Sequence, residues 1–190
     1  MIALRRFVLC LLGVAAMGLA EPPPPGGGLD GVPNVDVQYY AVAGRSIEEI
    51  RAAMNAARPT DFNDGQRVDA LTRWSLRWRW PRRADGACQL DRAEVTFSAT
   101  MQMPRLADPD HLPRDVRARW QAYMAALQTH EQGHVRHAWE NVESVLQAIR
   151  ASDCTHATDA GRAATQALAR WDVDYDRQTR HGLSQGAHFP

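Results

Sequence analysis

The sequence contains no lysine, so all 22 of its basic residues are arginines, and 22 acidic residues balance them to a formal net charge of zero. Proteins that bind nucleic acid through their backbone charges carry a clustered basic surface. The chain as a whole has no basic excess. The composition therefore argues against a nucleic-acid partner.

Long apolar runs are also missing after the first twenty residues. Residues 1–20 carry two arginines near their start, an apolar segment from Phe7 to about Ala16, and small residues before Glu21. This pattern is typical of a signal peptide, and its apolar segment is short for a membrane span. We predict signal cleavage and a secreted or periplasmic chain without a membrane span; a retained N-terminal anchor is the alternative.

Cysteine is scarce, with three in the whole chain. Cys10 lies in the predicted signal peptide, so the mature chain keeps Cys88 and Cys154. In an oxidising compartment, two remaining cysteines favour a disulfide bond. The alternative is two unrelated buried thiols.

A segment rich in proline and glycine separates the predicted signal peptide from the rest of the chain. Residues 21–33 include the run PPPPGGG, which can form neither a helix nor a strand, and we interpret them as a flexible leader. Residues 34–190 are enough for one domain with its own core. No internal repeat is visible.

Alternating apolar and polar residues predict three strands. They span Val35 to Val42, Leu71 to Trp80, and Ala93 to Met101. The second and third strands are expected to form an antiparallel pair, with Cys88 in their connection. The tryptophan-rich face of the second strand could be a ligand-stacking surface, but large aromatic residues on one face of a strand are more typical of a core.

Helical spacing predicts the remaining elements. A capping box at Ser46 begins a short helix that stops before Pro59, and a loop from Pro104 to Pro113 precedes a long helix. The long helix runs from about Arg114 to Arg150, a second starts near Asp159 and ends at Gly182, and residues 184–190 are expected to lack regular structure. The predicted fold is α+β: a small antiparallel sheet packed on the long helix and a C-terminal helix, as in zincins.

The long helix carries the pattern HExxH at His130–His134. Two histidines four residues apart leave the same face of a helix and can bind one zinc ion. Glu131 is rotated away from them, where it can take a proton from zinc-bound water. Gly133 has no side chain, which is expected to let another backbone segment approach the metal.

The histidines continue the apolar stripe of the same helix, which predicts that they are buried and argues against a solvated helix face. That stripe consists of Val116, Trp120, Tyr123 and Leu127. A catalytic zinc needs a third protein ligand. His137 lies about 10 Å along the helix axis from His130, too far to join the same ion. The candidates that remain are His181, Asp172, Asp174, Asp176 and His188.

The signal peptide, the two cysteines, HEQGH and the C-terminal YDRQTRHGLSQGAHFP together resemble a family of bacterial proteins of unknown function described as predicted secreted zinc-dependent proteases. The resemblance covers most of the mature chain. In that family HExxH recurs with a downstream YDxxTxHG segment, matched here by Tyr175, Asp176, Thr179, His181 and Gly182. The resemblance implies that His181 is the third zinc ligand.

These observations predict a zinc metallopeptidase that acts on a peptide or protein substrate in the envelope or outside the cell. Zinc is held by His130, His134 and His181, and Glu131 activates the water that attacks the peptide carbonyl. Tyr175 could donate a hydrogen bond to the oxyanion, although core packing is its commoner role.

Two alternatives stay open. The zinc site could be closed by a fourth ligand such as Asp176 and serve stability alone in an envelope binding protein. The chain could instead be a secreted binding protein that uses its tryptophan-rich sheet, with HExxH incidental. Neither the substrate nor the oligomeric state follows from the sequence.

Overall fold

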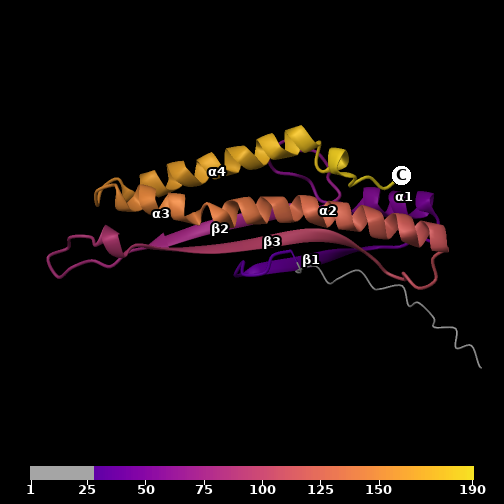
Figure 1. Ribbon diagram of the computed structural model, residues 1–190, viewed down its shortest axis with the longest axis horizontal. Helices are drawn as coiled ribbons and strands as arrows, with labels where there is room; N and C mark the ends of the chain where they lie inside the picture. The colour runs from indigo at the N-terminus through magenta and orange to yellow at the C-terminus, as the bar shows by residue number, and fades with distance from the viewer. Residues whose placement is uncertain (1–27) are drawn as a thin grey trace, which may run out of the picture.

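The computed structural model describes residues 28–190 (Figure 1). The predicted signal peptide and residues 21–27 of the predicted leader lie outside the described residues. At the end of that leader, Leu29 is buried, and Arg136 donates a hydrogen bond of 2.8 Å to the carbonyl of Gly28. In the part of the chain that the structure describes, no helix is long and apolar enough to cross a membrane.

A three-stranded sheet forms one layer of the molecule, with strand order β1-β3-β2. Strands β2 (Leu71–Arg79) and β3 (Glu94–Leu106) pair antiparallel, as predicted, but β1 (Val35–Val42) pairs parallel with β3. The predicted antiparallel sheet is therefore wrong, and the sheet is mixed. Parallel neighbours need a long connection, and the segment between β1 and β3 supplies one; alternation within a strand does not encode its direction.

Strand β3 continues through Pro104, which the sequence assigned to a loop. The pairing of β2 with β3 ends at Leu71 and Gln102, so β3 has only β1 beside it from Met103 onward. Proline lacks a backbone N–H and is tolerated where a strand has one neighbour. The loop before the long helix consequently shortens to residues 107–113.

One face of the sheet is buried, as the alternation predicts. Phe97, Ala99 and Met101 of β3 are almost fully buried, while Trp74 and Trp78 of β2 pack partly buried against the same core. The arginines and serines between them are exposed. The tryptophan row is thus part of the core, and one of its members also supports the site described below.

Four helices accompany the sheet: α1 (Ile47–Ala57), α2 (Arg114–Glu140), α3 (Val142–Arg150) and α4 (Ala157–Thr179). The capping box at Ser46 is present at the start of α1. Figure 1 shows α2 and α3 between the sheet and α4, with α4 running back over them. This return places the C-terminal half of α4 against the segment of α2 that carries the HExxH pattern.

The predicted helix from Arg114 to Arg150 is interrupted at Asn141, which separates α2 from α3. The Asn141 amide donates a hydrogen bond of 2.8 Å to the carbonyl of His137, and the Asn141 carbonyl accepts one of 2.7 Å from the hydroxyl of Ser144. Asparagine side chains compete in this way with helical hydrogen bonds. Apolar periodicity continues across the break and so cannot reveal it.

The C-terminal segment is more ordered than the sequence suggests. Leu183–Gln185 form a short 3₁₀ helix, η2, so the predicted lack of regular structure is wrong for Ser184 and Gln185, whereas residues 186–190 have no regular structure. Phe189 is 1% exposed, with its ring centroid 5.4 Å from that of Trp120 and 5.5 Å from that of Tyr123. A buried aromatic ring therefore anchors the end of the chain to α2.

Cys88 and Cys154 lie at disulfide distance, with their Cα atoms 5.7 Å apart. Cys88 lies in the connection between β2 and β3, and Cys154 lies in the turn between α3 and α4. The predicted pair therefore ties the sheet to the turn from which α4 starts.

Candidate metal centre

Helix α2 buries all three chemically informative residues of the HExxH pattern. His130, Glu131 and His134 are 2%, 4% and 6% exposed. The apolar stripe of the same helix is buried against the core further toward its N-terminus. The prediction that the histidines continue this stripe into the interior is confirmed.

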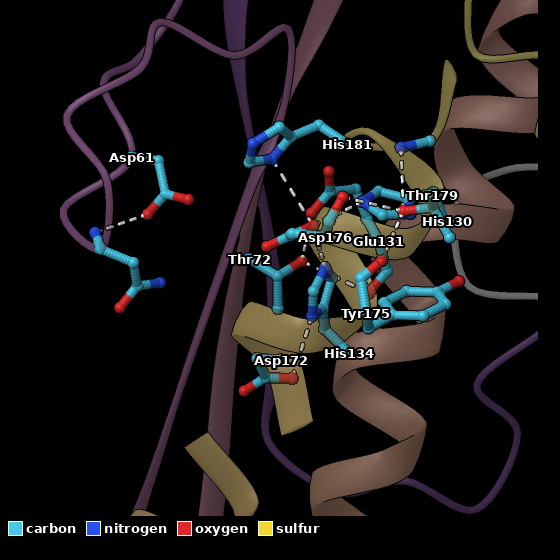
Figure 2. Close-up of polar contacts among 12 residues, drawn as sticks. Asp61, Thr72, His130, Glu131, His134, Asp172, Tyr175, Asp176, Thr179 and His181 are labelled. Carbon is cyan, nitrogen blue, oxygen red and sulfur yellow. Dashed lines mark hydrogen bonds and ion pairs between the residues drawn. The ribbon is translucent and has the colours of Figure 1, made fainter. Parts of the chain in front are cut away.

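Asp176 on α4 faces both histidines (Figure 2). Its Oδ1 lies 3.0 Å from His130 Nε2 and 3.1 Å from His134 Nε2. These three residues form a group whose possible ligand atoms all lie within 4.8 Å of one another. Of the candidates for a third ligand, Asp176 is thus the residue that the fold brings to the histidine pair.

The other ring nitrogens of the two histidines are already engaged. His130 Nδ1 lies 2.9 Å from Gln185 Oε1, and His134 Nδ1 lies 2.9 Å from Asp172 Oδ1. Both oxygens are acceptors, so each Nδ1 carries the proton and a neutral ring presents its Nε2 lone pair inward. Metal-binding histidines are commonly oriented by such outer acceptors.

The inward Nε2 atoms then face an acceptor, because Asp176 Oδ1 is a carboxylate oxygen. Two lone pairs and a carboxylate oxygen repel one another unless both rings are protonated or a cation lies among them. Two nitrogens and one oxygen, each with its lone pair directed at the others, are a suitable donor set for zinc. The residues present therefore fit a zinc ion.

The charges around the group act in the same direction. Burial lowers the pKa of His134, but hydrogen bonds to Asp172 and Asp176 outweigh it and raise the pKa to about 10. Burial raises the pKa of Asp176, but hydrogen bonds from the histidines hold that pKa well below the usual range. The nearby carboxylates favour a positive charge at the imidazoles. Either protons or a divalent metal ion can supply this charge, and the two compete for the same ring nitrogens.

Glu131 points into the same region from α2 and is held by strand β2. The hydroxyl of Thr72 donates a hydrogen bond of 2.6 Å to Glu131 Oε2. Burial raises the pKa of the Glu131 carboxyl, an effect that His134 and His130 oppose. A fixed, desolvated carboxylate beside a metal-binding group is suited to accept a proton.

These side chains line a cavity of about 320 Å³. The residues that line it come from strand β2, from helices α2 and α4, and from the loop that follows α1. A second cavity of about 840 Å³ adjoins it and shares Asp61, Asp176 and His181 with it. The candidate centre is consequently accessible from solvent.

Tyr175 packs on the histidines. Its ring is stacked on that of His130 with centroids 5.0 Å apart, and its hydroxyl accepts a hydrogen bond of 3.0 Å from Gln185 Nε2. A Cβ atom at Gly133 would lie 2.7 Å from the Tyr175 hydroxyl oxygen. The expectation that another backbone segment approaches Gly133 is therefore wrong, because an aromatic side chain occupies that space.

His181 lies beside the group of His130, His134 and Asp176 but is not part of it. Its Nδ1 is 3.5 Å from Asp176 Oδ1 (Figure 2). Its Nε2 is 3.2 Å from Asp64 Oδ2.

The other sequence candidates do not belong to the group of His130, His134 and Asp176. Asp174 forms an exposed ion pair of 2.8 Å with Arg177, and His188 is exposed. His137, which the helix geometry excludes from the site, stacks on Trp171 with ring centroids 3.7 Å apart. Asp172 lines the cavity but contacts His134 through Nδ1, the ring nitrogen that does not face Asp176.

The comparisons with known proteins give one result. The model of a family described as bacterial protein of unknown function, DUF922, matches residues 37–182. The chain belongs to this family. The match includes the HExxH residues, Asp176 and His181, and it ends before Gln185. No curated protein and no solved structure shows significant similarity to this DUF922 chain.

Three supporting residues of this DUF922 protein were missed by sequence reasoning: Thr72, Trp74 and Gln185. The Trp74 indole donates a hydrogen bond of 2.7 Å to Asp172 Oδ2, the other oxygen of the carboxylate that holds His134. One signal was available in the sequence. Asp172 and Asp176 are four residues apart on α4, as the histidines are on α2, so both carboxylates lie on one face of the helix. Nothing local marked Thr72 or Gln185, since only the fold brings them to α2.

Proposed function

We propose that this protein is a secreted or periplasmic zinc-dependent hydrolase, most specifically a metallopeptidase, with zinc held by His130, His134 and Asp176. One observation carries the proposal: two buried Nε2 atoms face a single carboxylate oxygen beside the buried Glu131. The resemblance of HEQGH and the YDxxTxHG segment to predicted secreted zinc-dependent proteases supports it.

Asp176 replaces His181 as the preferred third ligand in this proposal. Its oxygen is close to both Nε2 atoms, whereas His181 reaches only Asp176. Two histidines and one carboxylate are a ligand set of catalytic zinc sites, which keep a further position open for water or substrate. Asp172 and Gln185 would orient the histidines from outside.

A zinc ion in this group would polarise the substrate carbonyl and make water more acidic. Glu131 accepts the proton of the attacking water at its carboxylate and delivers it to the leaving amine. Thr72 limits the rotation of that carboxylate through its hydrogen bond to Oε2. Burial of Glu131 keeps bulk water from competing for the proton.

The size of the cavity restricts the substrate. A volume of about 320 Å³ lies at the lower end of ligand pockets, which span about 300–1,000 Å³. It can hold a few residues of an extended chain, which could continue into the adjoining cavity of about 840 Å³. The proposed substrate is therefore a flexible peptide or an unfolded protein segment.

The experiment is the substitution Glu131→Gln, which keeps the size of the side chain and removes the proton acceptor. Activity per bound zinc on unfolded protein substrates should fall by about a hundred- to ten-thousand-fold, while the zinc content is retained. Glu140→Gln, an exposed change at the end of the same helix, is the matched control. Equal activity per zinc in Glu131→Gln and wild type would remove Glu131 from the mechanism.

A further inference from the structure

A buried carboxylate without a counter-charge lies across the cavity from the HExxH residues. Asp61, in the loop after α1, is 3% exposed, yet it forms no ion pair with any residue in 28–190. Its Oδ1 accepts a hydrogen bond of 2.8 Å from the backbone N–H of Asn63. Its Oδ2 accepts none from the described residues. Oδ2 is not among the fully buried atoms that lack a partner, so it is open to the cavity, where a cation could supply the counter-charge that Asp61 lacks.

Two further ligand types surround the same point. The possible ligand atoms of Asp61, Asp64 and His181 lie within 4.8 Å of one another. Figure 2 shows the Asp61 oxygen that is not bonded to the loop on the side facing His181. The side chains of Asp64 and His181 are 36% and 25% exposed, which leaves a path from solvent.

The local charge favours a cation here. Asp61, Asp64 and Asp176 surround the single imidazole of His181, and no arginine of the described chain forms an ion pair with any of these three carboxylates. Even a protonated imidazole would leave this group negative. The ion pair of His181 with Asp64 therefore does not compensate the buried Asp61.

The backbone supports the same placement. Arg180 and His181 both adopt the left-handed conformation, with φ of 53° and 51°. Non-glycine residues rarely do so, and such strain is concentrated at functional sites. The strained turn at the end of α4 is what carries His181 to the loop of Asp61 and Asp64.

We propose that Asp61, Asp64 and His181 form a second divalent-cation site, next to the group of His130, His134 and Asp176. Two carboxylates and one imidazole suit Zn²⁺ or Mn²⁺, which accept mixed oxygen and nitrogen ligands. The contact of 3.5 Å between His181 Nδ1 and Asp176 Oδ1 joins the two groups. This inference concerns metal binding and does not require the protein to be a hydrolase.

The test is a Zn²⁺ titration of the full metal-free chain, by calorimetry and by metal analysis after desalting. Wild type should bind about two Zn²⁺ per chain, and Asp61→Asn should bind about one. Asparagine keeps the shape of the side chain and can still accept the Asn63 hydrogen bond. Asp174→Asn, which removes an exposed carboxylate of α4, should still bind about two.

Asp64→Asn is a second variant of the same site, chosen in case Asp61→Asn fails to fold. Asp64 is partly exposed, so the variant should fold, and it should also bind one zinc fewer than wild type. His134→Ala should lose the other zinc and retain this one. A wild-type stoichiometry of one, or a stoichiometry of two retained in both Asp61→Asn and Asp64→Asn, would overturn the second site. Neither result would affect the proposed role of Glu131, because that role is tested separately by Glu131→Gln.

Discussion

Two buried polar clusters lie along α2, one around Asp69 and one around Asp176, and they differ in how their charges are matched. Asp69 receives hydrogen bonds of 2.9 and 2.7 Å from Arg51 and one of 3.0 Å from the hydroxyl of Tyr123. Asp176 instead faces imidazole nitrogens whose partner nitrogens already carry the protons. The two carboxylates are buried to a similar extent, but they differ in the groups that pair with them.

Asp69 forms a structural ion pair with Arg51. Burial raises the pKa of Asp69, but the hydrogen bonds from Arg51, together with the charge of Arg58, outweigh it and hold the pKa below its usual value. Every polar atom of this carboxylate has a donor, so nothing is left for a ligand. Asp176 has no arginine partner and is balanced only by ring protons of the histidines, which a cation can replace. This exchangeable pairing, rather than burial, distinguishes the Asp176 cluster from the Asp69 cluster.

The largest expected effect is the loss of zinc from the Asp176 cluster in His134→Ala. The variant should bind no zinc at that group, because His134 contributes one of its two nitrogen ligands. His137→Ala, one turn further along α2, should keep most of it, since His137 stacks on Trp171 away from the group. Metal analysis of both variants decides. Equal loss of zinc in both would mean that His137 also binds the ion.

Asp176→Asn and Asp69→Asn should separate the two clusters. Asp176→Asn should weaken zinc binding at least about a hundredfold, because it removes a charged ligand. Asp69→Asn should leave zinc binding intact but lower the free energy of unfolding by about 3–5 kcal/mol, because it strands the partly buried Arg51.

Both variants should be compared by zinc competition and by denaturant unfolding of the metal-free chains, since bound metal would itself raise the apparent stability. A zinc affinity that falls in Asp69→Asn and is unchanged in Asp176→Asn would reverse the assignment of the clusters.

The smallest effect is expected from Gln185, which contacts the outward nitrogen of His130. Gln185→Leu removes the acceptor of His130 Nδ1 and should lower zinc affinity by about 10- to 100-fold without changing the stoichiometry. Ser184→Ala, an exposed neighbour in η2, should have no effect. An unchanged affinity in Gln185→Leu would show that His130 is oriented by the stacked Tyr175 instead.

Local pattern was sufficient for most of the scaffold. Alternation identified the buried faces of β2 and β3, and a capping box identified the start of α1. With Cys10 assigned to the predicted signal peptide, Cys88 and Cys154 left one possible pair. The apolar stripe of α2 likewise predicted that His130 and His134 are buried. Each of these features depends on residues close in sequence or on a count, which a single chain displays directly.

The tertiary structure decided everything that depends on which distant segments meet. The direction of strand β1 and the anchoring of Phe189 are outcomes of packing. So is the choice of partner for the histidines: Asp176 and His181 lie five residues apart in sequence, and only the return of α4 over α2 sets which of them reaches both rings. Periodicity tells which face of a helix is buried, whereas the chemistry of that face depends on what the fold places against it.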